Sequence, residues 1–460
     1  MLLLIASYYF YMCWKVEYII LIMISTLIDY CVARKMEKVE KKIHKRKWLY
    51  LSLLTNLGIL FGFKYFNFIN DNIQQLFDQI NIFYNIPGFN VLLPVGISFY
   101  TFQTLSYTID VYNGKTKAQK HLGVFAVFVS FFPQLVAGPI ERSHRLLPQF
   151  FIKHEFNYDR VRHGLQQMMW GFFKKVVIAD RLAIVVDGVY NNLDDYSGLA
   201  LILATIFFTF QIYCDFSGYS DIAIGSARVM GFELMDNFKR PYFSKSISEF
   251  WKRWHISLSS WFRDYLYIPL GGNKVMKWRW YYNLFITFLI SGFWHGANWT
   301  FIAWGALHGT YLITAIVLKN PKEKILEFLN IKNTTFHRIY QVFFTFILAS
   351  FAWIFFRANN LSDAIYIVTN LFSDIKSYGN FEAMAITLRG LGVGMNELLI
   401  SFGLIILMEL FNLYERGGDV WIQLKNKPIW IRWSIYYILI FGILFLAPYS
   451  RGGNFIYFQF

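Results

Sequence analysis

Charged residues are scarce in this chain of 460 residues. Asp, Glu, Lys and Arg together make up 16% of it, whereas soluble domains carry roughly 25%. Hydrophobic residues make up 56% of the chain, and 20% of its residues are aromatic. Because apolar stretches of about 20 residues recur along it, long enough to cross a bilayer, the composition predicts a polytopic helical membrane protein rather than a soluble one.

Cysteine and several common catalytic signatures are also missing or rare. The three cysteines, Cys13, Cys31 and Cys214, lie in apolar segments without a Cys-x-x-Cys pair, which indicates neither a disulfide framework nor a zinc site. The chain has no Gly-x-x-x-x-Gly-Lys-Ser/Thr loop, no His-Glu-x-x-His motif and no Gly-x-Ser-x-Gly elbow. These absences weigh against an ATP-driven pump and a serine hydrolase.

Positive charge is in excess, with 44 Lys and Arg against 29 Asp and Glu, a net charge of +15. The basic residues are scattered between the apolar stretches, which is typical of cytoplasmic loops and argues against nucleic-acid binding. The loop from Asp236 to Arg279, for example, carries nine basic and three acidic residues. We expect the basic loops, including 319–338 and 415–432, in the cytoplasm and the C-terminus outside; contact with anionic lipid is compatible with this charge.

Twelve apolar stretches are candidate spans. The stretch 121–138 contains Pro133 and ends in Ala137-Gly138-Pro139, which predicts a re-entrant segment, so we expect about 11 transmembrane helices. The sequences Gly305-x-x-x-Gly309 and Gly390-x-x-x-Gly394 would permit close helix packing. The candidate stretches are 1–14, 15–32, 48–67, 90–110, 121–138, 165–187, 198–214, 281–297, 299–318, 339–356, 395–413 and 431–448.

One histidine, His295, lies in the otherwise apolar run Phe285-Ile-Thr-Phe-Leu-Ile-Ser-Gly-Phe-Trp-His-Gly296. An ionisable residue inside a membrane is costly and usually has a functional role. Two interpretations stay open: a core histidine satisfied by a polar neighbour, or a general base, for which burial favours the neutral ring that is needed. If the helix continues past Gly296, Asn298 shares a face with His295. His308 would then lie on the opposite face, in a structural role.

A second histidine, His255, lies in the aromatic stretch from Ser246 to Ile268, which we predict to be one helix at the membrane surface. Ser246 and Glu249 fit a capping box, and Pro269 follows the helix. The stretch is either a simple interfacial anchor or a segment that points His255 inward, near Trp251 and Phe262. Its apolar stripe consists of Phe250, Trp254, Leu258, Trp261 and Tyr265.

Two carboxylates, Asp215 and Asp221, lie in the stretch Tyr213-Cys-Asp-Phe-Ser-Gly-Tyr-Ser-Asp-Ile-Ala-Ile-Gly225, near a cytoplasmic boundary. They could bind a cation, orient a histidine, or pair with Arg240 or Arg263. We favour the structural pairing.

Taken together, these stretches closely resemble the membrane-bound O-acyltransferase family, and within it the bacterial alginate and peptidoglycan O-acetyltransferases. The resemblance covers most of the chain. Family members usually begin with a further apolar segment, so this chain starts inside the family pattern. The matching stretches are Leu93-Pro-Val-Gly-Ile-Ser-Phe-Tyr-Thr-Phe-Gln103, Phe132-Pro-Gln-Leu-Val-Ala-Gly-Pro-Ile140, Asp215-Phe-Ser-Gly-Tyr-Ser-Asp221, Phe250-Trp-Lys-Arg-Trp-His-Ile-Ser-Leu258, Trp261-Phe-Arg-Asp-Tyr-Leu-Tyr-Ile-Pro-Leu-Gly-Gly272, Gly292-Phe-Trp-His-Gly296 and Asn454-Phe-Ile-Tyr-Phe-Gln-Phe460.

The resemblance implies an all-α fold, a single membrane domain over residues 1–460, in the bacterial inner membrane. It implies a ring of helices around a central funnel, with re-entrant and interfacial helices. It assigns the catalytic histidine to His295 and the second motif histidine to His255. From the matching stretches we assign substrate binding to Trp294, Asn298, Asp215, Arg263 and Asp264.

The implied reaction moves an acyl group from a cytoplasmic thioester to an extracytoplasmic hydroxyl. We expect acetyl-CoA as the donor substrate, no bound cofactor and no metal. The acceptor would be a cell-envelope polysaccharide or peptidoglycan, reached through an extracytoplasmic acetyltransferase partner. The alternatives are D-alanyl transfer to teichoic acid from a carrier-protein thioester, and a secondary transporter of polysaccharide or acyl donor.

Overall fold

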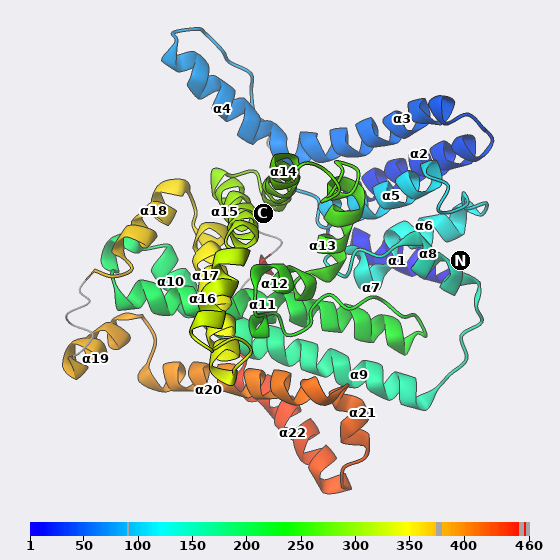
Figure 1. The fold of residues 1–460 in the computed structure, drawn as a ribbon. Helices are drawn as coiled ribbons and strands as arrows, with labels where there is room; N and C mark the ends of the chain where they lie inside the picture. Colours follow the sequence, from blue (N-terminus) through cyan, green and yellow to red (C-terminus); the bar gives the residue numbers. More distant parts are fainter. Residues whose placement is uncertain (90–91, 374–379, 450–454, 457–460) are drawn as a thin grey trace. The chain divides into compact units, whose positions relative to one another are not determined.

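The computed structural model describes residues 1–89, 92–373, 380–449, 455 and 456 (Figure 1). Helices, turns and loops make up all of these residues and no strand occurs among them, which confirms the all-α prediction. The chain forms two compact units that alternate along the sequence. The first unit comprises Met1–Val161, Ser226–Met235 and Ser260–Pro269, and the second comprises Arg162–Gly225, Asp236–Ser259 and Leu270–Phe460.

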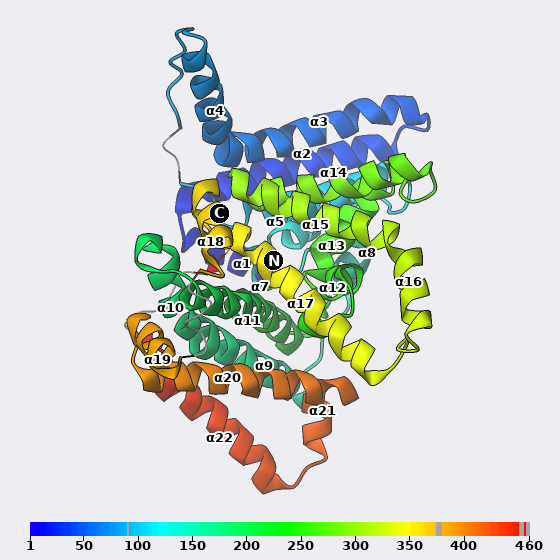
Figure 2. The ribbon, with the colours of Figure 1, turned by 60° about the vertical axis from the view of Figure 1, so that its left-hand side comes forward.

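In the first unit, three helices pack against one another: α2 (Ile19–Glu37), α3 (Lys42–Leu60) and α5 (Ile97–Tyr112) (Figures 1 and 2). A buried polar cluster joins two of them. Asp29 of α2 accepts a hydrogen bond from the Ser52 hydroxyl at 2.5 Å. Its other oxygen accepts a hydrogen bond from the side-chain amide of Asn56, in α3, at 2.9 Å. Buried polar groups are usually satisfied by such partners. The remaining helices of this unit include α1 (Leu2–Met12), α4 (Phe66–Gln79), reached through the π-helical turn Phe61–Tyr65, and α8 (Ser143–Leu146).

The stretch 121–138 is broken, as its proline and glycine predict. It forms α6 (Leu122–Ser130) and, after a non-helical Phe131, the short α7 (Phe132–Leu135) with Pro133 in its first turn. Gly96, in left-handed conformation (φ +76°) at the start of α5, lies so close that a Cβ there would be 2.6 Å from the Leu135 carbonyl. The break is confirmed, and entry and exit on one membrane side stays a prediction.

The second unit is built around α11 (Leu199–Val229), of whose apolar stretch 78% is buried. The helix α9 (Tyr158–Phe172) begins at the end of the first unit and continues through a π-helical turn (Phe173–Ala179) into α10 (Asp180–Tyr190). The other helices of the unit are α12 (Ile247–Arg253), α14 (Lys277–His295), α15 (Trp299–Val317), α16 (Lys319–Phe328), α17 (Thr335–Arg357), α18 (Leu361–Asn370), α19 (Phe381–Gly390), α20 (Met395–Tyr414), α21 (Val420–Lys425) and α22 (Ile429–Leu446).

Seven helical segments of the described chain are long and apolar enough to cross a membrane. The expected count of about 11 is not confirmed, because stretches such as 1–14, 90–110 and 165–187 form shorter or interrupted helices. The ring and the funnel stay predictions. The seven segments are Val16–Glu37, Lys42–Gln79, Leu199–Val229, Trp299–Val317, Thr335–Arg357, Met395–Gly417 and Ile429–Leu446.

Helices α14 and α15 form a tightly packed hairpin that carries His295 at its tip. A Cβ on Gly305 would lie 2.4 Å from the Phe288 carbonyl, and one on Gly309 would lie 3.2 Å from the Phe285 Cα. Glycine is therefore needed at 305 for this close approach and gives a tight contact at 309, as the Gly305-x-x-x-Gly309 spacing predicts. Gly390 and Gly394 have no atom within 4 Å of such a Cβ in the described chain, so the close packing that their spacing would permit does not occur there.

Candidate active site

His295 is the last residue of α14, and the chain turns there instead of continuing as a helix. Gly296 is extended (φ −164°), and Asn298 begins α15 as its N-cap by accepting a hydrogen bond from the Thr300 N–H at 3.0 Å. The Asn298 amide donates to the Asn359 carbonyl at 3.0 Å. The condition for Asn298 to share a helical face with His295 is not met, because the helix ends at Gly296. The side chain of Asn298 holds the hairpin turn.

Aromatic rings enclose His295, which is only 4% exposed. Its ring lies 5.0 Å from that of Trp304 and 5.3 Å from that of Phe356, both nearly perpendicular to it. The ring of Trp294, the preceding residue, lies 5.0 Å from the His295 ring. These contacts fix the imidazole plane and keep bulk water away, which strengthens any charge interaction made by a reacting group there.

His255 lies at a sharp break in the chain. Helix α12 ends at Arg253, Trp254 is extended, His255 has a left-handed backbone (φ +43°), and α13 (Ile256–Phe262) begins directly after it. The single helix predicted over 246–268 is therefore wrong, whereas the inward orientation considered for His255 is confirmed by its complete burial. The capping box is confirmed, since the Ser246 hydroxyl accepts from the Glu249 N–H at 3.2 Å.

Asn237 holds this break in place. Its backbone carbonyl accepts from the Ile256 N–H at 2.9 Å, and its side-chain oxygen accepts from the Ser257 hydroxyl at 2.9 Å. Its amide donates to Ser220 of α11 at 3.2 Å. A left-handed residue other than glycine costs free energy and persists only where its surroundings enforce it, so Asn237 is part of the framework that places His255.

The His255 ring is fully buried, 4.6 Å from Phe216 and 6.4 Å from Trp294. Because Trp294 also contacts His295, its indole lies in ring contact with both motif histidines. Burial lowers the pKa of His255 to about 3, so the ring is neutral near pH 7. The structure thus brings His255, Trp294 and His295 together within the second unit.

The aromatic stripe around His255 is buried inside the protein. Phe250, Trp254 and Leu258 are at most 1% exposed. The interpretation of this stretch as a simple interfacial anchor is wrong, since anchor rings would face the headgroups. Trp261 is buried as well: it stacks on Phe102 at 3.8 Å within the first unit.

His308 has a structural contact, as predicted. Its Nδ1 accepts a hydrogen bond from the Trp251 indole N–H at 3.2 Å, and its ring lies 4.9 Å from Trp304. The acceptor role requires the neutral ring with its proton on Nε2. Trp304 therefore separates this histidine from His295.

Asp215 pairs with a lysine that the sequence reasoning missed. Its carboxylate lies 2.6 Å from the Lys175 ammonium and accepts the Ile456 N–H at 2.9 Å. Lys175 also binds Asp180 at 2.7 Å. The expected pairing of Asp215 with Arg240 or Arg263 is wrong. The structural role that we favoured is supported, because removing the Lys175 charge would leave the buried Asp215 carboxylate without its ion-pair partner.

Lys174, the residue before Lys175, also pairs with a carboxylate of α11. Its ammonium binds Asp221 at 2.6 Å and the Ser217 hydroxyl at 2.9 Å. The sequence could have indicated these ion pairs, because the two adjacent lysines interrupt the apolar stretch 165–187. The closing motif 454–460 lies outside the described residues except for Phe455 and Ile456.

Arg263 and Asp264 belong to the first unit. The Arg263 side chain is exposed and pairs with Asp264 at 2.8 Å. Asp264 also lies 3.7 Å from Arg142. Nearby, burial raises the pKa of Glu141 to about 7, although the Met235 N–H donates to its carboxylate. Substrate binding by Arg263, Asp264, Trp294, Asn298 and Asp215 stays a prediction.

The described residues contain no group of three or more His, Cys, Asp and Glu side chains that could hold a metal ion. The groups at this site that can take part in a reaction are imidazole rings enclosed by aromatic side chains. Such a group can accept a proton from a hydroxyl and return it to a leaving group.

Comparison with known proteins assigns this sequence to a family. A model of the membrane-bound O-acyltransferase family matches residues 5–361. The chain is 38% identical over 477 residues to a probable alginate O-acetylase from Pseudomonas putida, covering 100% of this chain and 94% of that protein. It is 36% identical over 395 residues to a peptidoglycan O-acetyltransferase from Helicobacter pylori, covering 80% and 73%.

A more distant similarity is 29% identity over 237 residues to a teichoic acid D-alanyltransferase from Bacillus subtilis, which covers 49% of this chain and 60% of that protein. The region that matches the family model contains His255, His295 and the aromatic rings around them. The chain therefore belongs to the membrane-bound O-acyltransferase family and is an acyltransferase.

Proposed function

We propose that this protein transfers an acetyl group from a cytoplasmic thioester, acetyl-CoA, toward hydroxyl groups of a cell-envelope polysaccharide. The observation that carries the proposal is the enclosure of His295 by Trp294, Trp304 and Phe356 at the tip of the α14–α15 hairpin. Such an enclosure suits a reaction in which a thioester must meet a hydroxyl and not water. The family and the named activities of its relatives support the choice of reaction.

His295 acts as the general base in this proposal. It accepts the proton of the acceptor hydroxyl as the oxygen attacks the thioester carbonyl, which forms a tetrahedral intermediate. The C–S bond then breaks, and the departing sulfur takes the proton back from His295. The ester and a free thiol are the products, so that His295 ends the cycle neutral.

His255 acts as a positioning residue. Its pKa of about 3 keeps the ring uncharged, and its ring contact with Trp294 links it to the wall beside His295. A thioester carbonyl that develops negative charge needs a donor held in place beforehand, and we assign His255 or a polar neighbour to hold the thioester.

The acceptor and the partner belong to the proposal too. Relatives that cover most of this chain are named for alginate and peptidoglycan acetylation, which favours a polysaccharide acceptor. The extracytoplasmic acetyltransferase partner and the bacterial inner membrane are further parts of the proposal. D-alanyl transfer is the less favoured alternative, because the D-alanyltransferase similarity covers about half of the chain. Membership of an acyltransferase family argues against the transporter.

The test uses membranes that contain the protein, supplied in parallel with labelled acetyl-CoA and with a labelled D-alanyl carrier protein. Acetyl label should reach an extracytoplasmic protein or glycan, and D-alanyl label should not. The His295→Ala variant should transfer neither. Transfer of D-alanine alone, or full acetyl transfer by His295→Ala at equal expression, would refute the proposal.

A further inference from the structure

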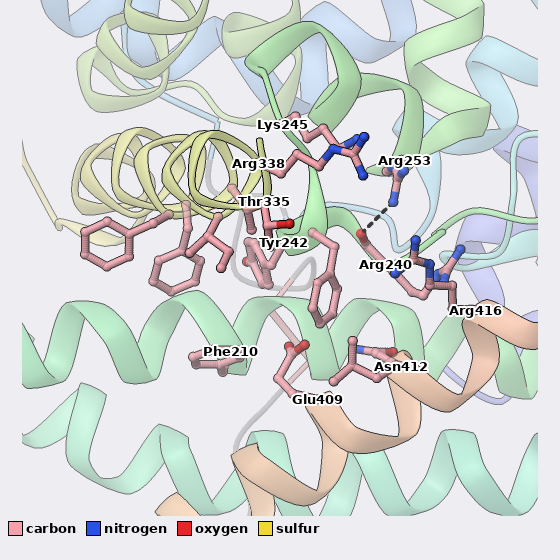
Figure 3. Close-up of a pocket in the computed structure, with 16 residues that line it drawn as sticks. Phe210, Arg240, Tyr242, Lys245, Arg253, Thr335, Arg338, Glu409, Asn412 and Arg416 are labelled. Carbon is pink, nitrogen blue, oxygen red and sulfur yellow. Dashed lines mark hydrogen bonds between the residues drawn. The ribbon is translucent and has the colours of Figure 1, made fainter. Parts of the chain in front are cut away.

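A cavity of about 710 Å³ lies within the second unit, lined by α11, α12, α17, α20 and the loops before α12 and after α20 (Figure 3). The motif histidines do not line it. Tyr242, on the cavity wall, contacts Trp254. Trp254 contacts Trp353, which contacts Trp304, and Trp304 contacts His295. Because these packed indoles fill the space between them, the cavity is separate from the candidate active site.

Five basic side chains line the cavity, against one carboxylate, Glu409, which gives a net charge of +4 (5 − 1). In Figure 3 the labelled basic groups gather on one side, while Glu409 points in from the opposite helix. Arg253 pairs with Glu249 at 2.6 Å, whereas the other four have no carboxylate within ion-pair distance in the described part of the chain. The five are Arg240, Lys245, Arg253, Arg338 and Arg416.

Several like charges gathered around one cavity repel each other, and a bound anion offsets that repulsion. The residues come from three loops, 236–279, 319–338 and 415–432, whose charge assigns them to the cytoplasmic side. Arg338 also stands in the first turn of α17, whose N-terminal N–H groups favour negative charge. Arginine side chains bind phosphate groups through paired N–H donors, as they bind carboxylates.

The remaining wall of the cavity is apolar and open on one side. It includes Ile339 and Phe343 of α17 and Leu413 of α20, which are 64%, 61% and 48% exposed. These helices are candidate membrane spans, so the wall continues into a surface suited to a hydrocarbon or extended chain. A ligand here needs an anionic head and a less polar tail.

Glu409 adds a third requirement. One of its oxygens is buried and has no hydrogen-bond partner among the described residues. A buried acceptor without a partner is unfavourable, so a ligand that offers an N–H or O–H beside its phosphate would satisfy it. A glycerol or ethanolamine headgroup and the amide chain of a nucleotide thioester both carry such a donor.

We propose that this cavity binds a phosphate ester carried on a longer chain, with the phosphate held by Arg338, Arg416 and their basic neighbours. Two sources share this chemistry: an anionic phospholipid of the membrane, and the nucleotide part of the acyl donor. Only the second source rests on the proposed acyl transfer. Binding is measurable without turnover, so failure of this proposal and failure of the proposed function are distinguishable.

The experiment uses the full chain in nanodiscs of neutral phosphatidylcholine. One arm titrates phosphatidylglycerol into the disc and counts bound lipid by native mass spectrometry. The other arm measures binding of unacylated CoA by calorimetry. Each arm compares the wild type with the double variant Arg338→Gln/Arg416→Gln and with a matched control, Lys322→Gln/Lys427→Gln. The control removes the same charge from the same two loops at exposed positions that do not line the cavity.

We expect the cavity variant to weaken binding at least about tenfold in one arm, the loss of two charge-assisted contacts, while the control changes it less than about twofold. Loss in the lipid arm identifies a phospholipid site, and loss in the CoA arm identifies a donor site. All variants lie at the cavity rim or surface, and gel filtration checks that they are folded. No binding in either arm, or equal binding by both variants, would overturn the proposal.

Discussion

Replacing Gly292 by alanine tests whether the α14–α15 hairpin places His295. A Cβ at this position would lie 2.2 Å from the Phe301 carbonyl oxygen and 3.1 Å from the Gly305 Cα. Both atoms belong to the backbone and cannot rotate away. To reach an ordinary contact of 3.4 Å, the two helices must separate by at least about 1.2 Å (3.4 − 2.2) at this point.

That separation acts on His295 because the histidine lies three residues later, at the end of the same helix. Overpacking of this kind costs about 1–3 kcal/mol of stability. A displacement of about 1 Å at a reacting group lowers the rate by about 100-fold. We therefore expect Gly292→Ala to lower both the thermal midpoint and the acyl-transfer rate.

The matched control is Gly403→Ala in α20, where an added Cβ meets no atom within 4 Å. Alanine is the better helix former by about 1 kcal/mol, so this variant should be at least as stable as the wild type and equally active. Midpoints come from fluorescence-detected gel filtration after heating in detergent, and rates from label transfer. A Gly292→Ala protein with the midpoint and rate of the control would refute the packing argument. Lost stability with an unchanged rate would refute its link to His295.

Three further predictions concern charge, protonation and capping. Lys175→Met should destabilise the protein by about 3–5 kcal/mol, because Asp215 stays buried without its partner, whereas Lys153→Met, at an exposed pair, should be neutral; equal thermal midpoints would contradict this. Because burial lowers the pKa of His255 to about 3, the unfolded chain takes up the proton first as the pH falls below about 6.5, and stability should drop by about 1.4 kcal/mol per pH unit there. His255→Gln should lack that component, so equal slopes of midpoint against pH, from about pH 7.5 to about pH 5, would argue against a buried neutral ring. Asn298→Ala should cost about 1 kcal/mol through the lost N-cap of α15, and an unchanged midpoint would contradict the capping role.

Patterns local in the sequence predicted much of the fold. The helical class, the break at 121–138, the capping box at Ser246 and the close packing at Gly305 and Gly309 each depend on neighbouring residues and on general propensities. The structure confirms all four. The location of His295 inside an apolar stretch also follows from the sequence, and the structure buries it.

The predictions that failed concern features that depend on contacts between segments far apart in the sequence. The helix break at His255 depends on Asn237, 18 residues upstream, whose side chain holds the start of α13, and no local pattern reveals that contact. The partner of Asp215 could not be chosen from charge alone, since Arg240, Arg263 and Lys175 were all available. Burial of the aromatic stripe likewise depends on which helices pack over it.

In the proposed reaction the protein, with His295 as its general base, moves an acetyl group from a cytoplasmic donor to the opposite side of the membrane. The most direct measurement places purified protein of known orientation in sealed vesicles with a hydroxyl acceptor inside and labelled acetyl-CoA added at the cytoplasmic face. The control for His295→Ala is His44→Ala, at an exposed position. Internal ester label with the wild type and His44→Ala, and none with His295→Ala, is the predicted result. Label that forms inside with His295→Ala at the wild-type rate would contradict the account.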